Sequence, residues 1–278
     1  MKFINMTINC KGILIDFSKP KIFGILNLTP DSFYDGGKYI GTQSVINQCN
    51  KMITEGADFI DIGAQSSRPG AKEISLDEEL KRLLPTLEIL LKKFPDVLFS
   101  IDTYRSKVAE ESINMGASII NDISSGNIDP QMMSTIGRLK VPLILMHMKG
   151  TPSVMKENPF YKDIITEMIK YFSEKINEAH SLGINDLIID PGFGFGKTIE
   201  DNYTILKNIE LFQNLNLPIM VGVSRKSMIY KKLGVNIENS LNGTSILNTV
   251  ALTKKVQILR VHDVKEAKEC IDLFQELK

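Results

Sequence analysis

The feature that most constrains the fold is a regular alternation of short apolar runs with longer amphipathic segments. Eight runs are almost continuously apolar, as in parallel strands covered on both faces, and occupy residues 22–26, 57–63, 97–102, 117–122, 141–147, 186–190, 217–223 and 256–262. Segments with helical spacing alternate with them, near residues 44–55, 77–93, 106–115, 130–138, 164–182, 200–213, 239–254 and 264–276. The pattern predicts eight consecutive βα units.

Eight such units predict an α/β fold, specifically a (β/α)8 or TIM barrel. A doubly wound open sheet is the structural rival, but it concentrates unusual residues at one glycine-rich switch point. Here they are spread over all eight strand ends, which favours the barrel. Before the first strand, "FINMTINCKGILIDF" alternates around a Lys-Gly turn and predicts a hairpin closing the bottom of the barrel. We therefore expect a single domain over 1–278, with the hairpin in 1–20 and the barrel in 21–278.

Composition excludes several classes of protein. The formal net charge of the 278 residues is zero, so the basic excess of a nucleic-acid-binding surface is missing. Apolar runs long enough for a transmembrane helix are absent, and the N-terminus lacks the apolar core of a secretory signal. The three cysteines are scattered and form neither a disulfide framework nor a metal cluster. These features predict a reduced, cytoplasmic protein that binds neither nucleic acid nor membrane.

Polar residues gather at the carboxyl ends of the predicted strands. In a (β/α)8 barrel these ends form one face, and active sites of barrel enzymes are built there. The residues concerned are Asn27, the segment 63–71, Asp102, Asn121, Asp122, Met146, His147, Asp190, the segment 224–227, Arg260 and His262. Individually, Asp122, Ser227 and Asp263 could be helix N-caps and His147 a structural histidine. The joint pattern over eight strand ends favours a site.

The chemistry of this face can be read from its residue types. Arg260 and His262 are two positions apart, so on a continuous strand they share a face and suit a phosphate or pyrophosphate. Arg225 and Lys226 precede a helix N-terminus, which is a further candidate anion site. Three acceptor-bearing side chains suit a flat heterocycle with an amino-lactam edge: Asp102, Asn121 and Asp190.

Metal binding can also be assessed from the sequence. Only three histidines occur, and none forms a His-x-His or His-x-x-His pattern, so a zinc site is not expected. An oxygen ligand such as Asn27 is better suited to Mg²⁺ held on a bound pyrophosphate.

Eight segments resemble, in order, the signature segments of the dihydropteroate synthase family of the folate pathway, the target of sulfonamides. They are "GILNLTPDSFYDGG", "DIGAQSSRPGA", "SIDTYRSKVAE", "IINDISSG", "LILMHMKGTP", "IIDPGFGFGKT", "GVSRKS" and "LRVHDV", which together span residues 24–264. The resemblance implies an enzyme that joins 6-hydroxymethyl-7,8-dihydropterin pyrophosphate to p-aminobenzoate, forming 7,8-dihydropteroate and pyrophosphate. It also implies Mg²⁺ as cofactor and a homodimer.

The resemblance further implies a role for each matching residue. The pterin-binding positions are Asp102, Asn121, Met146, Asp190 and Lys226. The pyrophosphate-binding positions are Arg260 and His262, with Asn27 helping to place Mg²⁺. The p-aminobenzoate pocket would be formed by Ser67, Arg68, Pro69, Phe195 and Ser227. The residues assigned to catalysis are Phe33, Asp35, Arg68 and Lys226.

The first two loops raise separate questions. Phe33 and Asp35 lie in a polar, glycine-rich segment that a plain turn does not explain, and we expect them to shield a cation-like intermediate in a closed site. In the second loop, the family commonly has Glu and Thr where this chain has Gln65 and Ser67. We expect this departure to affect how the second loop is ordered and how strongly p-aminobenzoate or an inhibitor binds.

Three rival functions remain open at this stage. A methyltetrahydrofolate-dependent methyltransferase would share the pterin contacts but has no use for a pyrophosphate clamp. A non-catalytic pterin-binding protein could dispense with Lys226 and the first loop, yet this chain has both. A phosphate-binding aldolase barrel would need a Schiff-base lysine inside a strand.

Overall fold

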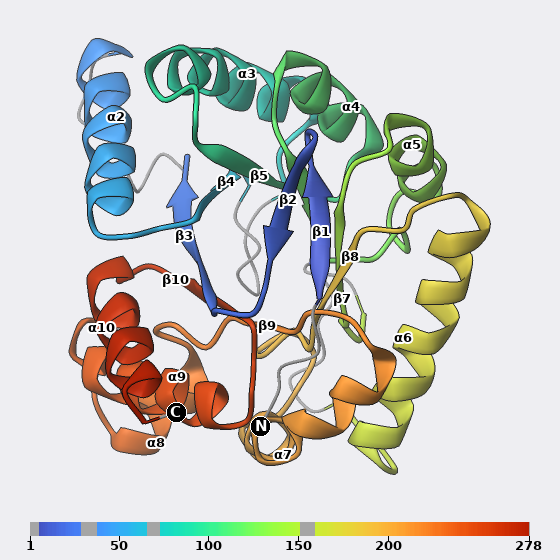
Figure 1. Cartoon of the computed structure of the whole chain (residues 1–278), viewed down its shortest axis with the longest axis vertical. Coiled ribbons are helices and arrows are strands. Elements are labelled where there is room, and N and C mark those ends of the chain that lie inside the picture. Colours follow the sequence, from blue (N-terminus) through green and yellow to red (C-terminus); the bar gives the residue numbers. More distant parts are fainter. Residues whose placement is uncertain (1–5, 29–37, 66–72, 151–158, 278) are drawn as a thin grey trace.

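The chain forms a barrel of parallel strands surrounded by helices (Figure 1). The computed structural model describes residues 6–28, 38–65, 73–150 and 159–277. The barrel strands are β3 (Lys21–Asn27), β4 (Phe59–Gly63), β5 (Leu98–Asp102), β6 (Ile119–Asp122), β7 (Leu143–Met146), β8 (Leu187–Asp190), β9 (Met220–Val221) and β10 (Ile258–Val261). They are ordered β8-β7-β6-β5-β4-β3-β10-β9, and a parallel bridge between Ile189 and Ile219 brings the two edge strands together.

The helices form an outer ring around these strands (Figure 1). They are α2 (Lys38–Thr54), α3 (Leu76–Lys93), α4 (Ser106–Met115), α5 (Met132–Leu139), α6 (Ile164–Ser181), α7 (Ile199–Lys207), α8 (Ser227–Leu233), α9 (Leu241–Thr253) and α10 (Val264–Gln275), with 3-10 turns at η1 (Ile209–Leu215) and η2 (Glu238–Ser240). The predicted (β/α)8 barrel is confirmed. None of the helices in the described residues is long and apolar enough to cross a membrane.

One predicted helix is divided in the structure. The spacing over 200–213 predicts one helix, but α7 ends at Lys207 and a 3-10 helix begins at Ile209. Asn208 separates them with a non-helical backbone, and its side-chain amide donates to the Thr204 carbonyl (2.8 Å). A side chain that satisfies a terminal carbonyl in this way ends the helical ladder.

The strands alternate between two environments because successive side chains point to opposite faces. Residues on the outer face pack against the helices in a large core that includes Ile60, Ile101 and Leu145. Those on the inner face form a second core at the amino ends of the strands: Phe23, Phe59, Ile119, Ile144, Ile188, Met220 and Ile258. Closer to the carboxyl ends of β4, β5 and β10, the same inner face carries Asp61, Asp102 and Arg260. The barrel interior therefore changes from apolar to polar toward its carboxyl end.

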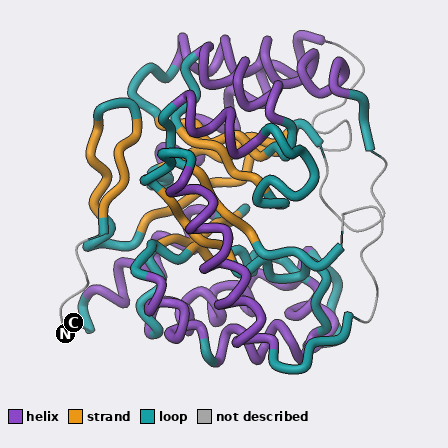
Figure 2. The backbone as a smooth tube through the Cα atoms, turned by 90° about the vertical axis from the view of Figure 1, so that its right-hand side faces the viewer, coloured by secondary structure: helices purple, strands orange, loops and turns teal. Residues whose placement is uncertain are grey.

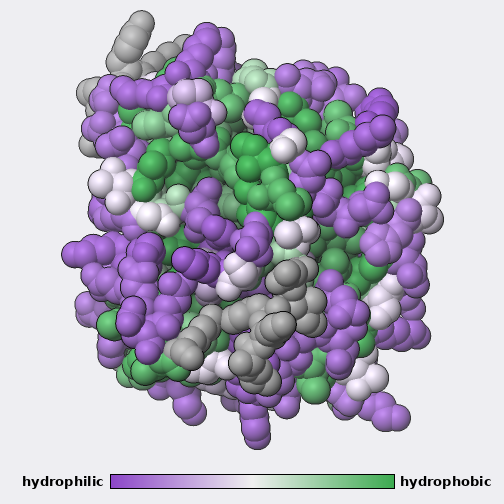
Figure 3. All heavy atoms as spheres, viewed as in Figure 1, coloured by the Kyte–Doolittle hydropathy of each residue, from purple (hydrophilic) through white to green (hydrophobic). Residues whose placement is uncertain are grey.

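A hairpin closes the apolar end of the barrel, as the sequence predicts. Strands β1 (Thr7–Cys10) and β2 (Ile13–Asp16) are joined by Lys11 and Gly12, both with positive φ. Ile8, Cys10 and Phe17 are buried in the same cluster as the first inward residues of the strands. Figure 2 shows the hairpin at one end of the barrel, and Figure 3 shows apolar surface on this end among mostly hydrophilic side chains.

The hairpin provides a matched test of this packing. Phe17→Ala removes a fully buried ring and should lower the free energy of unfolding by about 3–5 kcal/mol. Leu14→Ala, on the same hairpin but 68% exposed, should change it by no more than about 0.5 kcal/mol. Urea unfolding measures both values. Equal losses would show that the packing of Phe17 against the barrel core does not stabilise the fold.

Candidate active site

The polar strand ends lie next to one another at the open end of the barrel. In the strand register, Asn27 is opposite Gly63, Gly63 is opposite Asp102, and Asp102 is opposite Asn121. Adjacent strands are roughly 4.8 Å apart, so these residues form a continuous row along one rim. The structure therefore places Asn27, Asp102 and Asn121 near one another on one rim.

Arg260 lies in this mouth as a cation shared by two carboxylates. Its Nε donates to Asp61 Oδ2 (2.7 Å), and a terminal nitrogen lies 2.6 Å from Asp61 Oδ2 and 2.7 Å from Asp102 Oδ2. Burial alone lowers the pKa of Arg260, but the charges of Asp61 and Asp102 raise it overall. The guanidinium is therefore charged and held in a fixed orientation across β4, β5 and β10.

Asp102 has an altered protonation equilibrium in this setting. Burial raises the pKa of Asp102 to about 7, against the opposing effect of Arg260, and the nearby charge of Asp61 adds to the increase. A carboxyl group whose pKa is near neutrality, placed in the mouth of a barrel, is a candidate for ligand binding.

Asp61 is a residue that our sequence analysis did not single out. Its side chain is fully buried, and besides Arg260 its Oδ2 accepts from Asn121 Nδ2 (3.1 Å). Its Oδ1 has no hydrogen-bond partner among the described residues. A carboxylate at an inward position of the otherwise apolar segment "FIDIG" was the available signal, because an unpaired charge is not stable there.

Asp190 ends β8 and is tied to the loop that follows. Its Oδ1 accepts from the backbone N–H of Gly192 (2.7 Å). Burial raises the pKa of Asp190, whereas Lys226 opposes this effect. None of the described residues donates a hydrogen bond to the other carboxylate oxygen, and two parallel N–H groups of a ligand suit such a carboxylate.

Lys226 approaches the same loop from the start of α8. Its Nζ donates to the Phe193 carbonyl and lies 4.8 Å from the centroid of the Phe195 ring. Burial lowers the pKa of Lys226 to about 8, although Asp190 favours the charged form. Ser227 is the first residue of α8. Lys226 thus contacts the loop that follows Asp190, at Phe193 and Phe195.

Two further basic side chains have polar partners in the structure. His262 lies one residue beyond β10, and its Nδ1 is 3.1 Å from Ser224 Oγ. Arg225 donates to both oxygens of Asp263, at 2.9 and 2.7 Å. The candidate anion site at Arg225 is therefore replaced by a structural ion pair, because a carboxylate already fills the guanidinium fork.

An apolar wall borders the polar row. Met146 is buried in a small cluster with Tyr104 and Ile123, against which Phe195 packs. Met146 is also the register partner of Asp190 across β7 and β8. An apolar surface beside a row of hydrogen-bonding groups suits the flat face of a heterocycle.

The two ends of the second loop are held by one arginine. Arg105 donates to Gln65 Oε1 (3.2 Å), Glu73 Oε1 (2.9 Å) and the buried Glu79 (2.5 Å). Gln65 also donates to the Tyr104 hydroxyl (2.8 Å), which donates to Glu73. The Gln65 amide both accepts and donates a hydrogen bond. A glutamate at this position would instead add a third carboxylate beside Glu73 and Glu79.

Other predicted site residues lie outside the described part of the chain. They are Phe33, Asp35, Ser67, Arg68 and Pro69. Their assignment to a closed site and to the p-aminobenzoate pocket stays a prediction.

The described residues contain no cluster of three or more His, Cys, Asp or Glu side chains able to hold a metal ion. Asn27 Oδ1 and Asp102 Oδ2 nevertheless both flank Gly63, each within 4 Å of where a Cβ atom would lie. One or two protein oxygens fit Mg²⁺ that is bound mainly through a substrate's phosphates.

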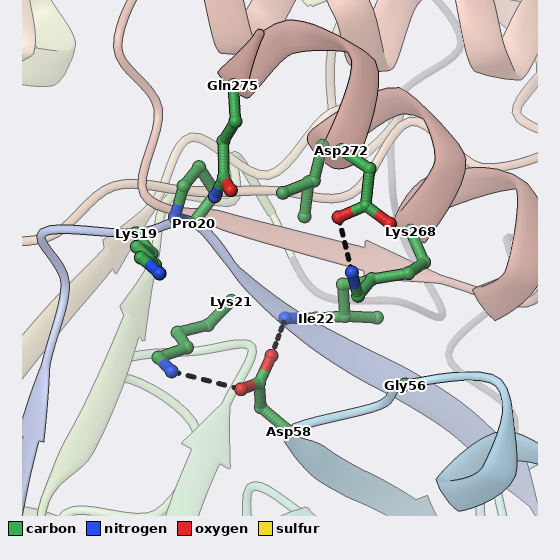
Figure 4. A pocket seen from close by; sticks show the side chains of 10 residues that line it. Lys19, Pro20, Lys21, Ile22, Gly56, Asp58, Lys268, Asp272 and Gln275 are labelled. Atoms are coloured by element: carbon green, nitrogen blue, oxygen red, sulfur yellow. Dashed lines mark hydrogen bonds and ion pairs between the residues drawn. The ribbon is translucent and has the colours of Figure 1, made fainter.

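A separate pocket with a volume of ≈ 210 Å³ lies between α10 and the amino end of β3 (Figure 4). Its carboxylates are already paired, Asp58 with Lys21 (3.1 Å) and Asp272 with Lys268. This internal neutralisation gives it no evident ligand chemistry.

The Arg105 network predicts a large local contribution to stability. Arg105→Met leaves the Glu79 side chain, which is 2% exposed, without its cation and should lower the free energy of unfolding by about 3–5 kcal/mol. Arg138→Met breaks an exposed pair with Glu110 and should cost at most about 1 kcal/mol. Adding Glu79→Gln to Arg105→Met should recover part of the loss in denaturant unfolding. No recovery would contradict a buried-charge origin.

Comparisons with known proteins show which family the chain resembles. Residues 23–262 match the family described as pterin binding enzyme. The Escherichia coli (strain K12) dihydropteroate synthase is 42% identical over 272 residues, covering 97% of this chain and 96% of that protein.

Two solved synthases share the fold. The Yersinia pestis enzyme in a sulfonamide drug complex has a TM-score of 0.92 and 39% identity, covering 98% and 99% of the two chains. The Xanthomonas albilineans enzyme in complex with 7,8-dihydropteroate has a TM-score of 0.87 and 31% identity, covering 98% of each.

The polar mouth, its apolar wall and these similarities over nearly the full length lead to one assignment. The chain belongs to the dihydropteroate synthase family of pterin-binding enzymes.

Proposed function

We propose that this protein joins 6-hydroxymethyl-7,8-dihydropterin pyrophosphate to p-aminobenzoate, forming 7,8-dihydropteroate and releasing pyrophosphate. The observation that carries the proposal is the convergence of Asp102, Asn121, Asp190, Lys226 and Arg260 on one barrel mouth. Family membership and the 7,8-dihydropteroate bound to the Xanthomonas relative support it.

The pterin would be held at its polar edge and its flat face. Asp190 accepts the parallel N–H groups of the amino-lactam edge, and Lys226 donates to the ring carbonyl. Asp102 and Asn121 complete the edge contacts, while Met146 lines the ring face. These roles use groups whose burial already shifts their pKa toward neutrality.

The pyrophosphate would lie toward Arg260 and His262. Arg260 is oriented by Asp61 and keeps its positive charge, so it can stabilise negative charge that develops on the leaving group. Asn27 would hold Mg²⁺ on the pyrophosphate. When bound, the metal ion supplies further charge neutralisation for the leaving group.

The substitution takes place at the methylene carbon between the pterin and the pyrophosphate. We propose that the C–O bond breaks first, with the electron pair leaving on pyrophosphate. The arylamine nitrogen then forms the new C–N bond and loses a proton. A weakly nucleophilic arylamine and a good leaving group favour this order, and Phe195 would border the arylamine. No covalent enzyme intermediate is required.

The rival functions are not favoured. The Escherichia coli relative, matched over 96% of its length, is a synthase, and neither a methyltransferase nor a non-catalytic binder explains the oriented Arg260. An aldolase function lacks support because the described strands carry a single lysine, Lys21, which is the first residue of β3 and is paired with Asp58.

We also propose that the protein is a homodimer in a reducing, cytoplasmic setting. Exposed apolar side chains gather around α8 and α9, including Leu233 (57% exposed) and Ile246 (54% exposed). Cys10, Cys49 and Cys270 are free. Sedimentation equilibrium should give a dimer, and Ile246→Asp should yield monomers. A wild-type monomer would contradict the proposal.

The activity is tested by pyrophosphate release from dihydropterin pyrophosphate and Mg²⁺, with and without p-aminobenzoate. We expect release that depends on p-aminobenzoate, and dihydropteroate by mass spectrometry. Asp190→Asn should raise the KM for the pterin substrate about 100-fold, because a charged hydrogen bond contributes roughly 1.5–3 kcal/mol. Asp96→Asn, an exposed control, should behave as wild type. Pterin binding without any product would contradict the proposal.

The pH dependence of pterin binding follows from two pKa values. Asp102 accepts N–H groups as a carboxylate, so binding should strengthen as pH rises through about 7. Lys226 donates as an ammonium, so binding should weaken as pH rises through about 8. Pterin fluorescence can follow this, since the chain has no tryptophan. Asp102→Asn should remove the acidic limb and Lys226→Met the basic limb. Limbs that persist in both variants would assign the titrations to other groups.

A further inference from the structure

The loop after β8 is pressed onto the end of β7. Gly192 has a φ of +69°, and a Cβ atom there would lie 2.2 Å from the His147 carbonyl oxygen. Gly196 has a φ of +58°, and its Cβ atom would lie 2.4 Å from the Lys149 carbonyl oxygen. Only glycine allows both the left-handed backbone and such close approach, so the seam between these segments is built from backbone.

Lys197 lies in this seam with its ammonium group buried. Its Nζ donates to the carbonyl oxygens of His147 (2.9 Å), Gly192 (2.9 Å) and Phe195 (3.0 Å). The residue is 9% exposed. An ammonium group has three N–H donors, so each is used and no acceptor is shared. The three bonds connect the end of β7 to two points of the loop that follows β8, Gly192 and Phe195.

The clamped loop carries groups that face the active site. The Gly192 N–H fixes Asp190, the Phe193 carbonyl accepts from Lys226, and the Phe195 ring faces Lys226. Lys197 itself makes none of these contacts. Displacing the loop would move all three groups together.

We propose that Lys197 is a positioning residue of the active site, which clamps residues 191–197 against β7 and so sets Phe195 for the arylamine substrate and Lys226 for the pterin. This inference rests on the proposed function. It adds a residue that acts on the substrates through other groups, without touching the reacting atoms.

Lys197→Met keeps the apolar stem but removes all three donors, and Lys207→Met is the matched control on the exposed face of α7. We expect the Lys197 variant to raise the KM for p-aminobenzoate at least tenfold and to lower kcat. Its affinity for inorganic pyrophosphate, measured by calorimetry with Mg²⁺, should stay within twofold of wild type, because Arg260 is held by β4 and β5. A lower melting temperature with unchanged KM and kcat would overturn the assignment.

Tyr161→Phe provides a second route to the same loop. The Tyr161 hydroxyl donates to the Gly196 carbonyl (2.7 Å), so its removal loosens the loop while leaving Lys197 in place. The variant should raise the KM for p-aminobenzoate about threefold, in the same direction as Lys197→Met. If Lys197→Met does not fold, an unchanged KM in Tyr161→Phe overturns the proposal.

The clamp also predicts a pH effect. Burial lowers the pKa of Lys197 to about 7, with Asp190 opposing the change and Lys226 adding to it. Above this pH a neutral amine has two N–H groups for three carbonyls, so the KM for p-aminobenzoate should rise in wild type. The charged and titratable groups around the clamp are His147, Lys149, Tyr161, Asp190, Asp201 and Lys226. Lys197→Met keeps all of them, so a pH profile equal to that of wild type would overturn the assignment.

A crystal structure of Lys197→Met gives a readout that does not depend on turnover. Displacement of Phe195 and loss of the bond between Lys226 and Phe193 would support the positioning role, even if the protein proved not to form dihydropteroate. An unchanged loop would overturn it. Absence of activity in the wild-type protein would instead contradict the proposed function.

Discussion

The site depends on one partly buried cation, the Arg260 guanidinium, held between Asp61 and Asp102. Breaking such an arrangement by removing one partner leaves an uncompensated charge inside the barrel, which is strongly unfavourable. The arrangement therefore links three strands, β4, β5 and β10, at the level where the interior turns from apolar to polar. It also fixes the direction of the guanidinium. The Asp102 side chain stays 11% exposed, and its pKa is raised to about 7. A structural ion pair and a binding group are thus combined in the same side chains.

The other half of the mouth is organised by backbone rather than by charge. The glycines at 192 and 196 let the loop lie directly on the end of β7, and Lys197 joins the two segments through carbonyl oxygens. Asp190, Lys226 and Phe195 take their positions from this seam. Two different constraints therefore shape one site: a charge cluster on the side assigned to pyrophosphate, and a packed loop on the side assigned to the pterin and the arylamine.

Much of this arrangement could be predicted from the sequence. The periodicity of the strands and helices is enough to predict the barrel, and polar strand ends locate its mouth because every parallel strand ends on the same face. Asp61 was harder to find, since it lies inside a strand and its partner Arg260 is 199 positions away in sequence. Arg225 was misread as an anion-binding group because its partner Asp263 was assigned only a capping role. The function of Lys197 depends on three backbone carbonyls, whose positions no residue pattern reveals.

The central claim is that the mouth binds a pterin through Asp190, Asn121, Asp102 and Lys226, beside a charged Arg260. A crystal structure with 6-hydroxymethyl-7,8-dihydropterin and inorganic pyrophosphate tests it most directly. The account predicts the amino-lactam edge on Asp190, the ring beside Met146 and the pyrophosphate toward Arg260 and His262, with the bond between Arg260 and Asp61 retained. A pterin bound elsewhere, or a heterocycle in the mouth that leaves Asp190 without a ligand contact, would contradict it.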